Sequence, residues 1–239
     1  MKTIGLIGGM SWESSAEYYR LINHGVKAAL GGHHNARSLM LTVDFHDIEH
    51  LQHEDRWDEL GLHMADAARR LVAGGADVLF LCTNTMHLLW PAIENAVDIP
   101  LVHIADPTGA AIERAGFRKV GLLGTRFTME QDFYRGRLQA RHGLEVIVPD
   151  EADRAIVHAV IYDELCLGKI VDASRHRLQA IIRTLESRGA ECVILGCTEL
   201  MLLLSPEDSV LPVFDTAALH AQAAVRIAIG SEAPPARHA

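Results

Sequence analysis

Two short segments of the chain recur after nearly the same interval, which is about half of its 239 residues. Ile4-Gly5-Leu6-Ile7-Gly8 resembles Val120-Gly121-Leu122-Leu123-Gly124, which begins 116 residues later. Leu81-Cys82-Thr83-Asn84 resembles Gly196-Cys197-Thr198-Glu199, which begins 115 residues later. Because two separate matches nearly agree, we interpret them as an internal repeat rather than a chance similarity of apolar runs. The repeat predicts two similar lobes.

Short apolar runs alternate with amphipathic segments of helical length. The apolar runs are rich in Ile, Val and Leu and mostly continuous, as is typical of parallel strands buried on both faces. We expect strands at Thr3–Ile7, Ser38–Val43, Val78–Leu81, Pro100–Ile104, Lys119–Leu123, Leu144–Val148, Cys192–Leu195 and Val210–Phe214. We expect helices at Tyr18–Leu30, Asp58–Ala73, Glu130–Arg141 and Arg175–Arg188, with glycines as C-terminal caps. The sequence therefore predicts an α/β fold of two pseudo-symmetric lobes, each a short parallel sheet flanked by helices, with an active-site cleft between them.

The repeat and the final helical pattern suggest the domain boundaries. We expect a first lobe at residues 1–104 and a second lobe at residues 105–215. The last helical segment, within residues 216–230, is expected to cross back to the first lobe. Residues 231–239, which include Pro234-Pro235, are expected to form a frayed tail.

Composition excludes several classes of protein. Hydrophobic residues make up 49% and charged residues 22%, which argues against a disordered or fibrous chain. A formal net charge of −9 disfavours binding to nucleic acid or to an anionic membrane surface. Apolar runs such as Val78–Cys82 are too short to span a bilayer, and the strand pattern at the N-terminus leaves no room for a signal peptide. We expect a cytoplasmic protein whose 4 cysteines are reduced thiols.

Both copies of the repeat place a cysteine at the end of a buried strand. Cys82 precedes Thr83-Asn84-Thr85, and Cys197 precedes Thr198-Glu199, where a new helix is expected to begin. A helix N-terminus lowers the pKa of a thiol from about 8.5 and can bind a carboxylate. Pseudo-twofold symmetry would make the two sulfurs face each other across one cavity. Two acid/base groups on opposite faces of a carbon atom are suited to racemisation or epimerisation.

A single cysteine at a strand end is more often a small buried hydrophobic residue than a catalytic group. Two cysteines at equivalent repeat positions reverse that preference. Cys166 and Cys192 have no such counterpart, and we interpret both as packing residues.

Several of these segments resemble the aspartate/glutamate racemase family. They are Ile4–Gly9, Cys82-Thr83-Asn84-Thr85, Gly124-Thr125 and Gly196-Cys197-Thr198-Glu199, and the resemblance runs from Met1 to about Ile229. The runs Gly8–Ser14, Val43–His46 and Thr128–Arg137 are similar to the branch described as broad-specificity amino-acid racemases. The resemblance implies a cofactor-independent enzyme that acts on an amino acid, with Cys82 and Cys197 as catalytic residues, and a homodimer.

The resemblance also implies a substrate-binding set. Asn84 and Thr85 would bind the α-carboxylate beside Thr83, while Thr125 and Thr128 would form the opposing wall. Met10 and Ser11 would line the floor. Thr198 would accompany Cys197, and Glu199 would polarise its surroundings or receive the ammonium group. A plain helix N-cap is the alternative for any one of these threonines.

Aspartate racemases of this family resemble one another in an Arg and a Lys that bind the side-chain carboxylate of the substrate. This chain lacks that pair at the expected positions. The segment His46-Asp47-Ile48-Glu49 has no Arg, and Cys166 stands where the Lys is expected, with Lys169 just beyond it. A neutral or varied substrate side chain is therefore at least as plausible as aspartate, because an unpaired carboxylate is costly to bury.

The sequence predicts neither a cofactor nor a metal. Gly5-Leu6-Ile7-Gly8-Gly9 lacks the G-x-G-x-x-G spacing of a dinucleotide site, and no lysine follows a strand end where a pyridoxal Schiff base could form. His46, His50 and His53 have helical spacing, but in a chain with 14 histidines we interpret them as a solvated helix face.

We therefore expect a cofactor-independent amino-acid racemase that uses two thiols. The alternatives are a strict aspartate or glutamate racemase and a sister chemistry, namely a hydantoin racemase, a maleate isomerase or a malonate decarboxylase. A non-catalytic protein that binds a small carboxylate is the alternative from another class.

Overall fold

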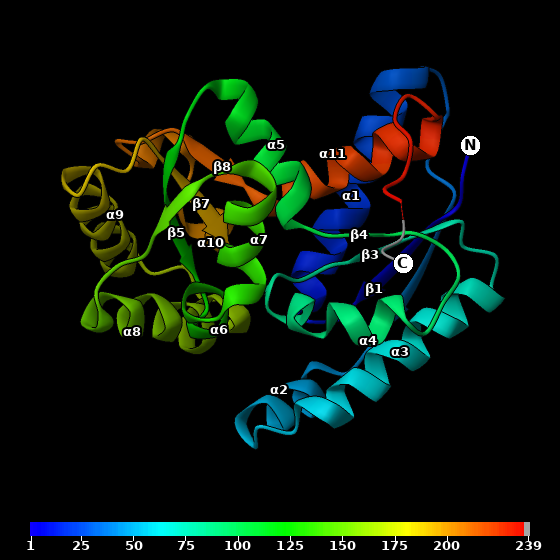
Figure 1. Ribbon diagram of the computed structural model, residues 1–239, viewed down its shortest axis with the longest axis horizontal. Coiled ribbons are helices and arrows are strands. Elements are labelled where there is room, and N and C mark those ends of the chain that lie inside the picture. Colours follow the sequence, from blue (N-terminus) through cyan, green and yellow to red (C-terminus); the bar gives the residue numbers. More distant parts are fainter. Residues whose placement is uncertain (237–239) are drawn as a thin grey trace. The chain divides into compact units, whose positions relative to one another are not determined.

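The computed structural model describes residues 1–236 and contains two compact units (Figure 1). Unit 1 comprises residues 1–104 and the chain from His220 onward, and unit 2 comprises Ala105–Leu219. Each unit is built on a parallel four-stranded sheet, with strand order β2-β1-β3-β4 in unit 1 and β6-β5-β7-β8 in unit 2. The two orders are equivalent, and the predicted α/β fold with two similar lobes is confirmed.

Unit 1 contains the first four strands. Its elements are β1 (Ile4–Gly8), α1 (Trp12–Leu30), β2 (Ser38–Thr42), α2 (Phe45–His53), α3 (Trp57–Ala73), β3 (Val78–Leu81), the 3₁₀ helix η1 (Thr85–Leu89), α4 (Trp90–Glu94) and β4 (Leu101–Val102).

Unit 2 contains the other four strands. Its elements are α5 (Ala105–Ala115), β5 (Lys119–Gly124), α6 (Arg126–Glu130), α7 (Asp132–His142), β6 (Glu145–Ile147), α8 (Glu151–Ala159), the π-helix η2 (Val160–Glu164), the 3₁₀ helix η3 (Leu165–Leu167), α9 (Asp172–Ser187), β7 (Cys192–Gly196), α10 (Leu200–Leu203), the 3₁₀ turn η4 (Pro206–Asp208) and β8 (Val213–Asp215). The last helix, α11 (Thr216–Ile229), begins in unit 2 and continues in unit 1, so the change of unit falls inside a helix rather than after residue 215.

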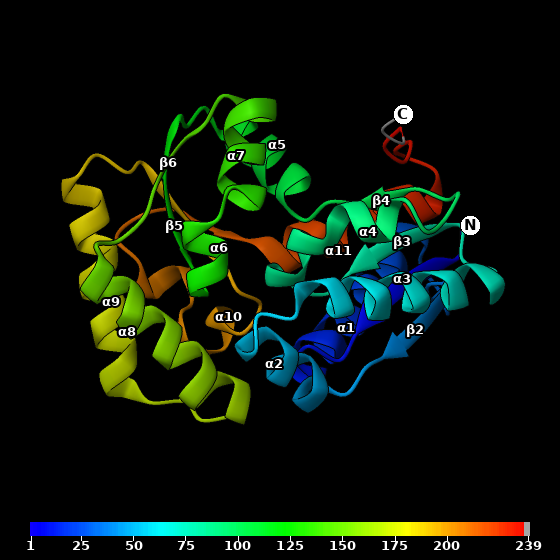
Figure 2. The same ribbon diagram turned by 60° about the horizontal axis from the view of Figure 1, so that its bottom comes forward.

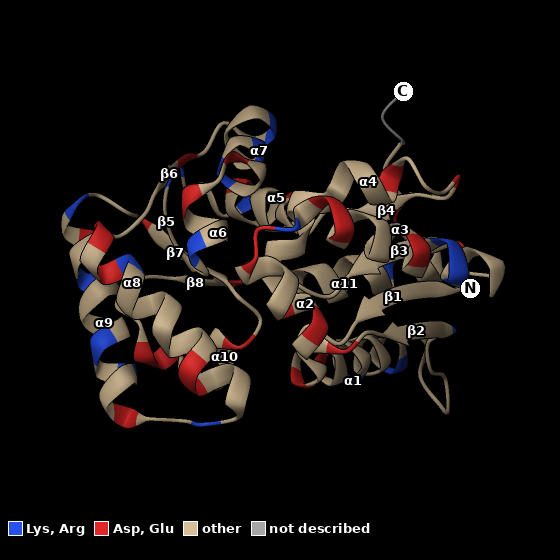
Figure 3. Ribbon diagram, turned by 90° about the horizontal axis from the view of Figure 1, so that it is seen from below, with Lys and Arg blue, Asp and Glu red and all other residues tan. Residues whose placement is uncertain are grey.

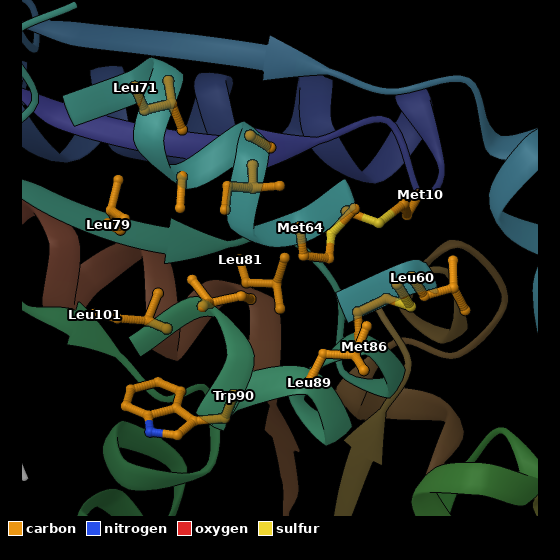
Figure 4. Close-up of a cluster of buried hydrophobic side chains, with 14 of the residues drawn as sticks. Met10, Leu60, Met64, Leu71, Leu79, Leu81, Met86, Leu89, Trp90 and Leu101 are labelled. Atoms are coloured by element: carbon orange, nitrogen blue, oxygen red, sulfur yellow. The ribbon is translucent and has the colours of Figure 1, made fainter. Parts of the chain in front are cut away.

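The sheet of unit 1 is covered on both faces. On one face, α2, α3, η1 and α4 pack on Leu79, Leu81 and Leu101 through side chains that include Leu60, Met64 and Trp90 (Figure 4). On the other face, α1 lies beside the part of α11 that belongs to this unit, and the Cα of Gly25 leaves space for Val225. This double burial explains why β1 and β3 contain no charged residue, whereas helices and connecting segments do (Figure 3).

The sheet of unit 2 lies between α5 and α7 on one face and α8 and α9 on the other (Figure 2). A Cβ at Gly121 of β5 would meet Leu185 of α9 at 2.9 Å, so this glycine permits the helix to approach the sheet closely. Gly143 follows α7 at φ 61°, the left-handed conformation of a glycine C-cap.

Several helices differ from the expected pattern, and α8 at Glu151–Ala159 lies where no helix was expected. α1 starts at Trp12 rather than Tyr18, because the side chain of Ser11 caps it by accepting from the N–H of Ser14. α5 was not expected, since it contains Pro107 and Gly109, and it is stabilised by its packing on α7. Across residues 1–236, every helix is either too short or too polar to span a membrane. Residues 237–239 of the predicted tail lie outside the described part.

Candidate active site

The predicted site residues of unit 1 gather at one edge of its sheet. β1 and β3 are parallel neighbours, so the residues that follow them lie at the same edge. Met10 and Ser11 come after β1, and Cys82 comes directly after β3, where its N–H donates to the carbonyl of Ile7 at 2.9 Å. Thr83, Asn84 and Thr85 follow, and every one of these six side chains is at most 8% exposed.

The segment between β1 and α1 is fixed by close backbone contacts. Gly9 has φ 98°, and a Cβ there would lie 2.2 Å from the carbonyl oxygen of Val43. The N–H of Gly9 donates to Ser15 Oγ at 2.7 Å, and Ser15 Oγ donates to the carbonyl of Ser11 at 2.8 Å. The hydroxyl of Ser11 is the N-cap of α1, so a structural role for this residue is established alongside its predicted place at the site.

Unit 2 repeats this arrangement at the equivalent edge. Thr125 follows β5 and caps α6 by accepting from the N–H of Thr128 at 3.3 Å, and the two hydroxyls are 3.2 Å apart. Thr128 is fully buried against the ends of both central strands: Cβ atoms built at Gly124 and Gly196 would lie 3.2 and 3.4 Å from its side chain. Ser11 and Thr125 are thus the N-caps of the helices that follow the first strand of each unit.

Cys197, Thr198 and Glu199 form a hydrogen-bonded group after β7. Both Cys197 Sγ and Thr198 Oγ1 donate to Glu199 Oε2, each at 2.9 Å. The carboxylate is 3% exposed and Cys197 is 8% exposed. One oxygen of this buried carboxylate therefore accepts both hydrogen bonds, from the thiol and from the hydroxyl.

The expectation that helix N-termini lower the pKa of the two thiols is wrong for this structure. Burial raises the pKa of Cys82 far above its ordinary value. Burial also raises the pKa of Cys197, with the negative charge of Glu199 as the next cause. The segments after the cysteines are a five-residue 3₁₀ helix and a four-residue α-helix, which are too short to offset the loss of hydration.

Cys166 lies closer to the site than its interpretation as a packing residue implies. It is half-buried in η3, and its electrostatic interaction with Cys197 is a further cause, after burial and Glu199, of the raised pKa of that thiol. The chain around it leaves α-helical geometry, passing from the π-helix η2 into η3. π-helical turns occur frequently at functional sites. Cys192, in contrast, is fully buried in β7, as expected of a packing residue.

The helix α2 follows β2, the parallel neighbour of β1, and two of its three histidines pair with glutamates. His50 Nε2 lies 3.3 Å from Glu54 Oε1, and His53 Nδ1 lies 2.8 Å from Glu49 Oε1. All four side chains are partly exposed. Within the described residues, no three His, Cys, Asp or Glu side chains converge as metal ligands.

The profile of the Asp/Glu/Hydantoin racemase family matches residues 7–224, which is most of the chain. The chain belongs to this family. The match includes both cysteine segments and all strands except the start of β1.

Relatives within the family support the assignment. The broad specificity amino-acid racemase RacX of Bacillus subtilis is 29% identical over 171 residues, which cover 70% of this chain and 72% of the relative. A crystal structure of an Asp/Glu racemase candidate from Yersinia pestis is 52% identical, with a TM-score of 0.89 over 96% of this chain and 100% of that chain. An aspartate racemase homologue from Pyrococcus horikoshii is 33% identical, with a TM-score of 0.81 over 97% of this chain and 100% of that chain.

Proposed function

We propose that this racemase interconverts L- and D-amino acids without pyridoxal phosphate, using Cys82 and Cys197 as the two acid/base groups. The observation that carries the proposal is the equivalence of the two cysteines. Each follows the third strand of its sheet, beside the segment that follows the first strand. In this proposal each unit supplies one thiol.

Two-base racemisation needs one thiolate and one thiol at the start of each turnover. The thiolate takes the α-proton from one enantiomer, and the thiol then delivers its own proton to the opposite face of the carbanion. The pair ends in the opposite protonation pattern, ready for the other enantiomer. Hydrogen-bond donors that bind the substrate carboxylate stabilise the carbanionic charge as it develops. Thr83, Asn84, Thr85, Thr125 and Thr128 are the proposed donors.

Burial favours the neutral form of both thiols, so one of them must lose a proton before catalysis. Glu199 is the proposed acceptor in unit 2. The proton moves from Cys197 Sγ to Glu199 Oε2 along the existing 2.9 Å hydrogen bond, which leaves a thiolate beside a neutral carboxylic acid. This transfer moves the negative charge and does not create a new one in the buried site.

We further propose that the preferred substrates have neutral or varied side chains. Unit 2 offers Cys166 where the aspartate racemases are expected to have a lysine, and the exposed Lys169 lies beyond it. The name of RacX, a broad specificity racemase, supports this direction.

The deciding experiment is exchange of the α-hydrogen in D₂O. The purified protein is incubated with a panel of L-amino acids that includes aspartate and glutamate, and deuterium at Cα is followed by NMR. Chiral chromatography of the same samples measures the D-enantiomer. A racemase produces both signals, whereas a protein that only binds carboxylates leaves the α-hydrogen in place. Exchange restricted to aspartate or glutamate would contradict the broad specificity, and turnover of hydantoins or maleate alone would assign a sister chemistry.

We also propose that the enzyme is a cytoplasmic homodimer. Light scattering of the purified protein tests the second part, since a monomer has a mass of 26.2 kDa.

A further inference from the structure

Unit 1 contains a buried histidine cluster that the proposed chemistry does not use. We give the name histidine cluster to His87 of η1, His103 after β4 and His220 of α11. All three are at most 2% exposed. The ring centroids of His87 and His103 are 4.5 Å apart, and those of His87 and His220 are 6.0 Å apart.

Hydrogen bonds fix the protonation of His87. Its Nδ1 lies 2.7 Å from the carbonyl oxygen of Thr83, and its Nε2 lies 3.1 Å from the backbone N–H of Ile104. A carbonyl oxygen can only accept and an N–H can only donate. The ring is therefore neutral, with its proton on Nδ1.

Cys82 lies between two anchors. The backbone N–H of Cys82 continues the sheet by donating to the carbonyl of Ile7 at 2.9 Å. After it, the carbonyl of Thr83 accepts the hydrogen bond from His87. The imidazole also binds Ile104, the last residue of unit 1 before the chain passes to unit 2. One buried ring thus joins the segment that carries the thiol to the segment that follows β4.

We propose that His87 is a positioning residue that fixes the direction of the Cys82 thiol by holding the Thr83 carbonyl. The inference rests on the proposed function in that Cys82 is taken as an acid/base group. Proton transfer at carbon is sensitive to placement, because an error of about 1 Å in a reacting group can cost 10²-fold in rate. In this proposal the hydrogen bond from Nδ1 to the Thr83 carbonyl positions the thiol. The hydrogen bond that Nε2 accepts from Ile104 contributes only to the stability of the fold.

Two substitutions separate these contributions. His87→Asn keeps an amide donor near the place of Nδ1 and removes the acceptor for Ile104. His87→Gln places its amide near Nε2 and leaves the Thr83 carbonyl without its donor. Each variant loses one of the two hydrogen bonds, so both should lower the Tm. His63→Gln, at an exposed position of α3, is the matched control.

The expected result is a difference between the two variants in kcat. His87→Gln should lower kcat at least about tenfold with KM within about threefold, and His87→Asn should retain at least about ten times the kcat of His87→Gln. Equal losses of kcat in both variants would assign His87 a structural role only. A kcat of His87→Gln within threefold of the His63→Gln control would also overturn the proposal.

A second measurement needs no substrate and so stands apart from the proposed function. Alkylation by iodoacetamide is followed for each cysteine by peptide mass spectrometry in the wild type and the three variants. We expect the alkylation rate of Cys82 to differ at least about fivefold between His87→Gln and His87→Asn, while that of Cys197 stays the same in both. Equal Cys82 rates in the two variants would overturn the positioning role, whether or not the protein racemises any amino acid.

Discussion

The thiol of Cys197 donates a hydrogen bond of 2.9 Å to the carboxylate of Glu199, two residues further along the chain. Cys82 has no carboxylate at the equivalent position, because Asn84 stands there. The two halves of the repeat therefore share a backbone arrangement and differ in the group that adjoins the sulfur. This difference makes the two thiols chemically distinguishable.

Glu199→Gln should affect the acidity of Cys197 and the rate of racemisation in opposite senses. The negative charge of Glu199 raises the pKa of Cys197, so its removal should lower that pKa. Racemisation should nevertheless fall by about 10²-fold, because the proposed proton acceptor is lost. The pH dependence of Cys197 alkylation measures the first effect and kcat the second. Glu207→Gln, at an exposed turn, is the control. Unchanged kcat in Glu199→Gln would remove the carboxylate from the mechanism.

Cys82→Ala and Cys197→Ala should each abolish racemisation, since a single remaining thiol cannot both remove and deliver the proton on opposite faces. The loss should be at least about 10²–10⁴-fold, the range of general acid–base catalysis. Cys192→Ala, in the core of unit 2, should lose stability and keep its activity. Chiral chromatography provides the rate and circular dichroism the folding. Near wild-type racemisation by either active-site variant would refute the two-thiol assignment.

Cys166→Lys should shift specificity toward aspartate. A lysine there would introduce a positive charge near Cys197, which should also lower the pKa of that thiol. The ratio of kcat/KM for aspartate to that for a neutral amino acid should rise at least about tenfold. Leu167→Lys adds the same charge at the next position, where the side chain is 62% exposed, and should leave the ratio unchanged. Equal ratios in the two variants would show that residue 166 does not face the substrate side chain.

The two glycines Gly9 and Gly31 provide a matched pair for stability. Both have positive φ, 98° and 75°, but only at Gly9 would a Cβ meet backbone, at 2.2 Å from Val43 O. Gly31→Ala should cost about 1 kcal/mol from conformational strain alone. Gly9→Ala should cost more than about 3 kcal/mol, because the β1–α1 segment must move. Urea unfolding measures both, and equal costs would contradict the close packing at Gly9.

Acid should destabilise the protein through His220. Burial lowers the pKa of this histidine to about 3, whereas the unfolded chain has its ordinary value near 6.5. Between these values the unfolded state binds a proton that the folded state excludes, so stability is full above pH 6.5 and decreases as the pH falls. The slope should be about 1.4 kcal/mol per pH unit. Urea unfolding at pH 7.5, 6 and 5 tests it. His220→Asn should remove the contribution of one proton to this slope, which is about 1.4 kcal/mol per pH unit. An identical slope in that variant would contradict the assignment.

The strand pattern could be predicted from the sequence because the strands are buried on both faces. All eight apolar runs correspond to strands, and the paired cysteines fall at the predicted strand ends. α5 could not be predicted, because its Pro107 and Gly109 have low helix propensity and tertiary packing overrides it. The raised pKa values of Cys82 and Cys197 could not be predicted either, because they depend on how deeply the fold buries each thiol. His87, His103 and His220 are distant in sequence, and only the fold brings them together.

The passage of α11 from one unit to the other bears on the order of folding during synthesis. Tyr18 on α1 donates to or accepts from His220 at 2.9 Å, and Val225 fills the space beside Gly25. Unit 1 therefore lacks one of the two helices that cover this face of its sheet until the ribosome has translated beyond residue 220. The whole of unit 2 is complete by then. The two units of this racemase therefore become complete at nearly the same stage of synthesis, in contrast to the usual order in which an N-terminal domain matures first.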